Sequence, residues 1–316
     1  MLEKFIKFVE DKALGVDSII ITIDRSNGVQ EKYAHHFVPD ARNNIRSISK
    51  VVSCLGVYKA MERRFFDLDS DVMSFFGDIK IRNYGNIAPL SKLKIKHLLN
   101  LTMGHETGLM FSKDMKNLPA GTDFIEYILN YDIRHDPGTF FVYNNAATYL
   151  LCAIVQRLTG MYFGDWVHGT ILRHLGIERP DWEKSNQNIC LGASGLYLNN
   201  EEMHRIGLLL LRGGNYENTQ IVDSDWVNAM HTPQFLTANL AEYAAKQKRC
   251  INKMAYGYHL WICGDGSLEY PKTHYFVDGT DGQFLIVSPK QRMVLTILSH
   301  QKNMDPFYEI LNDYIQ

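Results

Sequence analysis

The stretch RSISKVVSCLGVYKAMER, residues 46–63, decides the fold because it combines a helical pattern with a Ser-x-x-Lys spacing at Ser47 and Lys50. Residues three apart share one face of a helix, so this spacing places a hydroxyl beside an amine. A serine hydroxyl becomes a good nucleophile when a neighbouring base removes its proton. Apolar residues on one face predict a helix from Ser47 to about Arg64: Ile48, Val51, Val52 and Leu55.

The spacing is a weak signal by itself, since it recurs at Ser91–Lys94 within LSKLKIKHLL. That second copy is typical of a helix start with solvated lysines. The first copy differs in its setting, because predicted strands precede it and small helix residues follow it, namely Ser53, Cys54 and Gly56. Small residues let a helix lie close to its neighbours. We therefore favour Ser47 over Ser91 as the nucleophile.

A second pattern is Tyr143-Asn144-Asn145, which precedes a predicted helix. Pro137-Gly138 marks a turn, and Asn144 or Asn145 is a suitable N-cap for the helix. Tyr143 then lies in the entering loop, where its side chain can point into a cleft. Tyr-x-Asn is also weak by itself, because the chain repeats it at Tyr84, Tyr197 and Tyr216.

Strand signals lie near both ends of the chain, and helical signals lie between them. An Asn27-Gly28 pair between two alternating segments predicts a hairpin. An amphipathic helix is expected at the N-terminus, from the spacing of Leu2, Phe5, Ile6, Val9 and Ala13. The strands expected are Ser18–Ile23, Val29–Val38, Tyr256–Cys263, Phe284–Val287 and Met293–Leu298. The later helices expected are Ala146–Leu158, Glu202–Leu211 and Asp305–Ile315.

This order predicts an α/β (α+β) fold: a central antiparallel sheet from both termini, flanking helices and an inserted helical region. We expect one domain over residues 1–316, with its sheet part near 1–45 and 250–316 and its helical part near 46–249.

Composition limits the function classes. The formal net charge is −2 and the Lys and Arg residues are scattered among acids, which argues against nucleic acid as the main partner. No apolar run approaches the ~20 residues that span a bilayer, so we expect no membrane partner and a cytoplasmic protein. The five cysteines lack CxxC spacing, and Cys54 and Cys152 are expected to be buried. No metal site and no cofactor motif is apparent.

Longer strings carry a family resemblance. Residues 46–63 resemble the nucleophile helix of the serine β-lactamase and penicillin-binding protein superfamily, in its class C β-lactamase-like group of esterases, DD-peptidases and oligomer-amide hydrolases. IKHLLNLTMGHETGL (95–109), DPGTFFVYNNAATYLLCAIVQRLTG (136–160) and DGTDGQFLIVSP (278–289) resemble further blocks of that group in order and spacing. The stretch from Ala193 to Met230 is similar to a long helical segment of it.

The resemblance implies that Ser47 attacks a carbonyl and forms an acyl-enzyme. Lys50 and Tyr143 would share proton transfer, and Asn145 would hydrogen-bond the lysine or the substrate. If Lys50 is the base near pH 7, its pKa must fall roughly 3 units from about 10.4, which burial and a nearby cation could cause. The alternative base is the phenolate form of Tyr143, and the sequence leaves this choice open.

The family's third motif, usually Lys-Thr-Gly or His-x-Gly, is where this chain departs. The favoured register places Val277-Asp278-Gly279 there, so that the N–H of Thr280 would join that of Ser47 as an oxyanion hole. A count back from Pro289 would instead put His274 at the lysine position, within Lys272-Thr273-His274. In the favoured register the cation is missing, and Asp278 would repel an anionic substrate.

We therefore expect a cofactor-free serine hydrolase that acts through an acyl-enzyme on a small-molecule ester or amide, with neutral substrates preferred. One alternative is a true β-lactamase or DD-peptidase that acts on β-lactam or cell-wall-like substrates. Another is a non-catalytic binding protein on the same scaffold, although the presence of Ser47, Lys50 and Tyr143 together argues against it.

Overall fold

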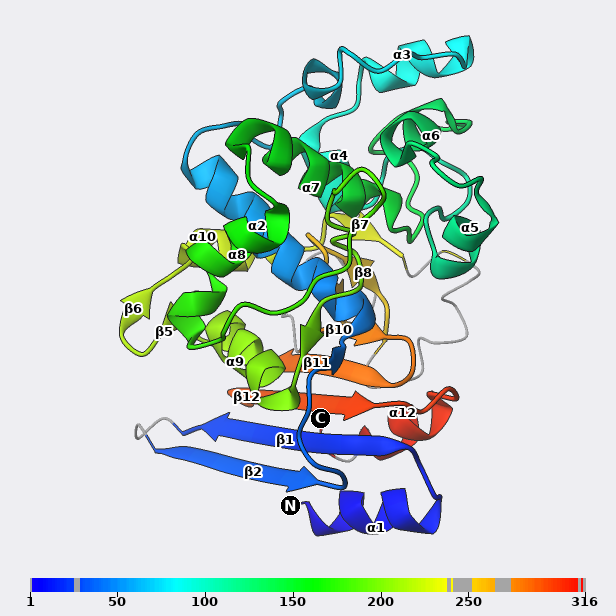
Figure 1. Ribbon diagram of the computed structural model, residues 1–316. Helices are drawn as coiled ribbons and strands as arrows, with labels where there is room; N and C mark the ends of the chain where they lie inside the picture. Colours follow the sequence, from blue (N-terminus) through cyan, green and yellow to red (C-terminus); the bar gives the residue numbers. More distant parts are fainter. Residues whose placement is uncertain are drawn as a thin grey trace.

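An eight-stranded antiparallel sheet dominates the computed structural model, which describes residues 2–25, 29–237, 240, 252–264, 274–311 and 314. The strand order is β2-β1-β12-β11-β10-β9-β8-β7 (Figure 1). The two ends of the chain meet where β1 (Val16–Asp24) pairs with β12 (Met293–Ser299), with Ile20 opposite Thr296. The predicted antiparallel sheet from both termini is confirmed.

The remaining strands range from two to seven residues in length. In the sheet they are β2 (Gln30–His36), β7 (Phe235–Leu236), β8 (Ala255–Tyr256), β9 (Trp261–Ile262), β10 (Tyr275–Gly279) and β11 (Gln283–Ser288). Two small pairs lie outside it, β3 (Asn43–Asn44) with β4 (Tyr197–Leu198) and β5 (Asn215–Tyr216) with β6 (Thr219–Gln220).

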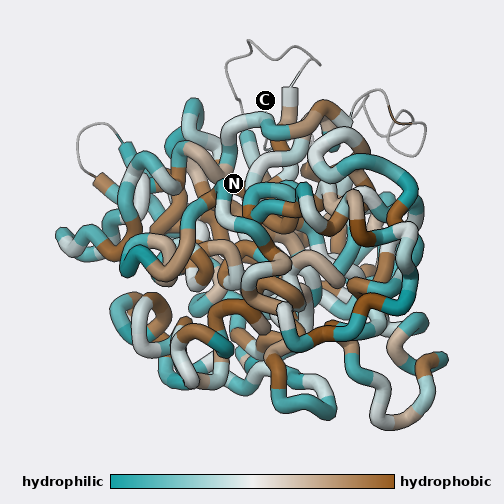
Figure 2. The backbone as a smooth tube through the Cα atoms, turned by 90° about the horizontal axis from the view of Figure 1, so that it is seen from above, coloured by the Kyte–Doolittle hydropathy of each residue, from teal (hydrophilic) through white to brown (hydrophobic). Residues whose placement is uncertain are grey.

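Helices cover the sheet and fill the region inserted between its strands. They are α1 (Glu3–Asp11), α2 (Ser49–Glu62), α3 (Ile87–Leu90), α4 (Ile95–Leu99), α5 (Ser112–Asn117), α6 (Phe124–Asn130), α7 (Ala146–Thr159), α8 (Phe163–Thr170), α9 (Asn200–Leu211), α10 (Ser224–Met230) and α12 (Asp305–Leu311). Hydrophobic segments lie inside the tube drawing and hydrophilic ones at its periphery (Figure 2). No helix in the described part of the chain is long and apolar enough to span a bilayer.

Helix α9 and helix α12 both pack against the sheet. His204 of α9 hydrogen-bonds Thr22 of β1 at 2.7 Å and Thr296 of β12 at 2.9 Å. The ring centroids of Phe307 on α12 and Phe284 on β11 lie 5.6 Å apart. Strands β11 and β12 are therefore buried at every position and are mostly apolar, since they are covered by helices.

Helix α2 is the central helix of the molecule (Figure 1), and it is buried from Ser49 to Val57. Its close approach to α8 depends on Gly56, where an added Cβ would lie 2.5 Å from a methyl group of Val167. The indole of Trp166 donates a 2.9 Å hydrogen bond to the Gly56 carbonyl. The small residues of this helix thus serve close packing, as the sequence predicted, and Cys54 and Cys152 are fully buried.

The structure also corrects some predicted elements. Tyr256–Cys263 is not one strand but the hairpin β8–β9, because Gly257 donates to the Leu260 carbonyl at 2.9 Å and His259 has φ +58°. Strand β7 lies inside the region expected to be helical. The stretch from Ala193 begins with β4 before α9 starts.

Other expectations remain open. The Asn27-Gly28 turn and the end of the C-terminal helix lie outside the described residues. The assignment of the whole chain to one domain remains a prediction.

Candidate active site

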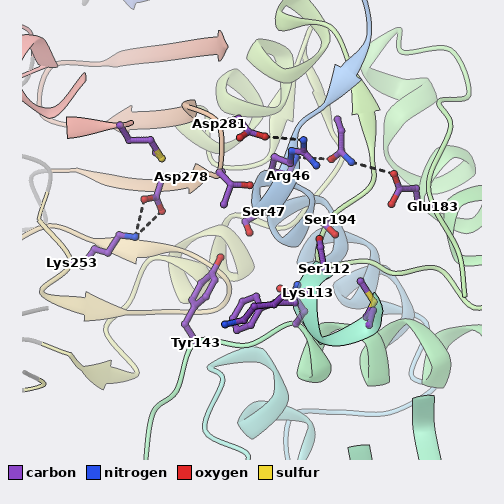
Figure 3. A pocket seen from close by; sticks show the side chains of 17 residues that line it. Arg46, Ser47, Ser112, Lys113, Tyr143, Glu183, Ser194, Lys253, Asp278 and Asp281 are labelled. Atoms are coloured by element: carbon purple, nitrogen blue, oxygen red, sulfur yellow. Dashed lines mark hydrogen bonds and ion pairs between the residues drawn. The ribbon is translucent and has the colours of Figure 1, made fainter. Parts of the chain in front are cut away.

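A cavity of about 520 Å³ opens where α2 begins, and its size suits a small-molecule ligand (Figure 3). Five of the six predicted site residues line it: Ser47, Tyr143, Asn145, Gly279 and Thr280. The sixth, Lys50, lies one helical turn below Ser47 and is fully buried. Residues from three distant parts of the sequence therefore meet around one serine hydroxyl.

Ser47 belongs to a short 3-10 turn, Arg46–Ile48, that leads into α2. Arg46 has φ +54°, a left-handed conformation that is uncommon for a residue with a Cβ. Side chains hold this turn, since Asn44 accepts a 2.9 Å hydrogen bond from the Arg46 N–H and Ser49 donates a 2.7 Å one to the Arg46 carbonyl. The half-buried Ser47 side chain therefore reaches the cavity from a fixed turn.

The Lys50 amine donates to three oxygens. Its Nζ lies 3.3 Å from the Ser47 hydroxyl, 2.6 Å from Oδ1 of Asn145 and 3.3 Å from the Ala193 carbonyl. All three partners are uncharged, so they stabilise the ammonium less than a carboxylate would. Burial lowers the pKa of Lys50 to about 7, and the Asp278 carboxylate opposes that shift. Near neutral pH a large fraction of Lys50 is an uncharged amine.

Asn144 and Asn145 have different roles: the first caps a helix and the second faces the cavity. Oδ1 of Asn144 accepts a 2.9 Å hydrogen bond from the Ala147 N–H and so caps α7. Asn145 is thereby free for the cavity: its Nδ2 donates to the Met110 carbonyl at 3.0 Å, which turns Oδ1 toward Lys50.

Tyr143 enters the cavity from the loop before α7 and points toward Ser47 (Figure 3). Its ring stacks on Trp261 at 5.6 Å between centroids, and Nζ of Lys50 lies 4.7 Å from the ring centre. Burial raises the pKa of the Tyr143 phenol well above its ordinary value, and a hydrogen bond with Ser47 only partly offsets this. The phenol is therefore protonated at neutral pH.

Strand β10 brings the third motif to the cavity. A Cβ at Gly279 would lie 2.8 Å from Cβ of Arg46 and 3.0 Å from the Ile45 carbonyl, so only glycine allows this approach to the Ser47 turn. Thr280 follows on the cavity wall. His274 lies before the strand, where its Nδ1 is 3.3 Å from the Ser288 hydroxyl. Lys272 and Thr273 lie outside the described residues.

Two ion pairs that the sequence analysis missed lie beside the third motif. Lys253 pairs with Asp278, and Arg46 pairs with Asp281 at 2.8 Å. The motif itself contains no cation, but the expectation of an uncompensated, repulsive Asp278 is wrong: Lys253 compensates that carboxylate from a segment 25 residues earlier. No motif contains Lys253, so no local sequence signal identified it.

The cavity thus combines a serine hydroxyl, a buried amine with a pKa near neutrality and a protonated phenol. This set can deprotonate an alcohol and return a proton to a leaving group, as nucleophilic acyl transfer requires. Lys113 and Glu183 add single charges to the wall of the cavity.

Comparisons with known proteins identify the family and the fold. A family model described as Beta-lactamase matches residues 21–316. Three solved structures share the fold. A Bacillus anthracis protein named as a 6-aminohexanoate-dimer hydrolase is 20% identical with a TM-score of 0.74. The match covers 97% of this chain and 79% of that protein. EstCE1, a hydrolase with promiscuous acyltransferase activity, is 14% identical with a TM-score of 0.75. The match covers 99% of this chain and 98% of EstCE1. The octameric penicillin-binding protein homologue from Pyrococcus abyssi is 19% identical with a TM-score of 0.72. The match covers 99% of this chain and 76% of that protein.

Proposed function

The chain belongs to the beta-lactamase family and is a serine hydrolase, and from this premise we propose that it cleaves a small ester or amide through an acyl-enzyme on Ser47. The observation that carries the proposal is the buried amine of Lys50, 3.3 Å from the Ser47 hydroxyl. A charged surface lysine at the same distance could not remove the serine proton at neutral pH.

Each proton has a donor and an acceptor in the proposed cycle. Neutral Lys50 takes the Ser47 proton while Oγ bonds to the substrate carbonyl carbon, and the N–H groups of Ser47 and Thr280 stabilise the oxyanion. The leaving alcohol or amine departs with a proton from Lys50, relayed by the Tyr143 phenol. Water then attacks the acyl group by the same route and releases the acid and free Ser47.

Near neutral pH the uncharged amine of Lys50 is a more available base than the Tyr143 phenolate. Burial disfavours the charged form of each group, so it makes the lysine neutral and keeps the tyrosine protonated. Lys50 is active once it has lost its proton. Activity should therefore rise as the pH passes through about 7.

The two ion pairs favour neutral substrates for a different reason from the one inferred from the sequence. Lys253 and Arg46 already have carboxylate partners, Asp278 and Asp281. A substrate carboxylate that binds Lys253 or Arg46 would have to compete with these aspartates, whereas a neutral acyl group would not.

A burst experiment with p-nitrophenyl acetate tests the proposal. Wild-type protein should release about one p-nitrophenol per enzyme molecule before the slower steady state, if deacylation limits turnover. Intact mass should then show one acetyl group on the protein, and peptide mapping should place it on Ser47. Hydrolysis at an unchanged rate by Ser47→Ala would contradict the proposal.

A further inference from the structure

Asp278 and Lys253 form a nearly buried ion pair at the cavity wall (Figure 3). Their side chains are only 11% and 13% exposed, and Nζ of Lys253 lies 2.9 and 2.8 Å from the two carboxylate oxygens. The Tyr308 hydroxyl on α12 donates to Asp278 at 2.9 Å. Burial raises the pKa of Asp278, but Lys253 and Tyr308 more than compensate and hold it below its ordinary value. The Asp278 carboxylate is therefore charged at neutral pH.

Contacts hold both the backbone and the side-chain amine of Lys253. Its carbonyl accepts a 2.7 Å hydrogen bond from the Thr237 hydroxyl, and its Nζ lies 4.5 Å from the centre of the Trp261 ring. Trp261 is also the ring on which Tyr143 stacks. The pair thus belongs to the wall that supports the reacting side chains and differs from a solvent-exposed ion pair.

Most groups that face Lys50 carry no charge near neutral pH. Ser47, Asn145 and the Ala193 carbonyl are uncharged partners. Tyr143 is held protonated by burial. His259, in the β8–β9 turn, shares a 3.1 Å hydrogen bond with Thr148, and burial together with nearby Lys50 lowers its pKa to about 3. His259 is therefore neutral throughout the pH range of interest.

Among the described residues, Asp278 on β10 is the charged group that acts on the ionisation of Lys50, and it acts on that of Tyr143 as well. Its carboxylate favours the ammonium form of the lysine, and a nearby cation weakens that influence. Arg46 with Asp281, Lys113 and Glu183 lie on other parts of the cavity wall.

We propose that Asp278 and Lys253 are positioning residues that act through Lys50: the carboxylate favours the ammonium, Lys253 limits that effect, and together they set the pH at which the hydrolase becomes active. This inference rests on the proposed function, in which neutral Lys50 is the base.

Opposite effects from the two halves of one ion pair provide the test. The acid limb of kcat/KM for p-nitrophenyl acetate, followed from pH 5 to 9, reports the ionisation of the base in the free enzyme. Asp278→Asn leaves Lys253 uncompensated and should move the limb to lower pH by about half a unit or more. Lys253→Met leaves the carboxylate uncompensated and should move it to higher pH by a similar amount. The double variant should lie between the two.

A matched control is the partly buried pair of Asp24 with Arg212, which joins β1 to the residue after α9, away from the cavity. Asp24→Asn should lower the melting temperature and leave the midpoint of the limb unchanged. If Asp278 and Lys253 had a purely structural role, the acid limbs of the two variants would move in the same direction, or neither limb would move. Either result overturns the inference. Failure of Ser47 to be acylated would instead overturn the proposed function.

Discussion

Ser47–Lys50 and Ser91–Lys94 have the same spacing, yet their surroundings are opposite. Lys50 is fully buried and its Nζ lies 3.3 Å from the Ser47 hydroxyl. Ser91 instead donates to the Ala88 carbonyl at 2.8 Å, and Lys94 pairs with the exposed Asp71 at 2.5 Å. In the second segment the hydroxyl and the amine have separate partners.

The difference shows that Ser-x-x-Lys spacing alone does not make a lysine a base. The fold must also bury the amine and place it beside the serine hydroxyl. An amine in water, beside a carboxylate, remains an ammonium at neutral pH and cannot act as a base. Removal from water, with amide and carbonyl oxygens as its partners, makes the amine of Lys50 available. The predictions that follow compare the two segments or the groups around Lys50.

The largest expected effect comes from exchanging the two serines for alanine. Ser47→Ala should lower kcat/KM for p-nitrophenyl acetate by about 10³-fold or more, because the covalent route is lost. Ser91→Ala should keep the wild-type rate within about twofold, since its hydroxyl only caps a helix end. A loss of activity in Ser91→Ala with an intact fold would reverse the assignment.

The proton-transfer pair should give the next largest effect. Lys50→Ala and Tyr143→Phe should each lower kcat/KM by about 10²-fold or more, and the double variant should be little worse than either. The matched controls are Lys94→Ala and Tyr84→Phe, from the other copies of the two patterns, and both should retain activity. Losses that multiply in the double variant would mean that Lys50 and Tyr143 act independently.

Substrate preference should show a smaller effect. We expect kcat/KM for p-nitrophenyl butyrate to exceed that for the cephalosporin nitrocefin by about tenfold, the value of one charged hydrogen bond. A nitrocefin carboxylate that binds Lys253 or Arg46 must displace Asp278 or Asp281 from its cation. A higher value for nitrocefin would favour the β-lactamase alternative.

The smallest effect should come from the surface ion pair. Lys94→Met removes a contact between side chains that are 32% and 58% exposed, so unfolding free energy should fall by less than about 1 kcal/mol. Chemical denaturation followed by circular dichroism measures this. A loss of several kcal/mol would show that the Ser91–Lys94 segment has a structural role that its exposure does not indicate.

The sequence predicted the parts of the fold and of the candidate site that local patterns record. Apolar periodicity indicated α2 and the terminal strands, and helical spacing placed Lys50 beneath Ser47. It did not predict the β8–β9 hairpin, because the turn at His259 is buried and lacks the usual polar turn residues. Nor did it predict Lys253, whose partner is set by sheet pairing and lies 25 residues away.

The most direct test of the central claim is to locate the reactive residue chemically. The native protein would be incubated with a fluorescent phosphonate and, separately, with a fluorescent penicillin, and each product read by intact mass and peptide mapping. We predict one phosphonate adduct per chain, on the peptide that contains Ser47, and slower labelling by the penicillin. Phosphonate on the peptide that contains Ser91, or no adduct on the folded protein, would contradict the assignment of Ser47 as the nucleophile.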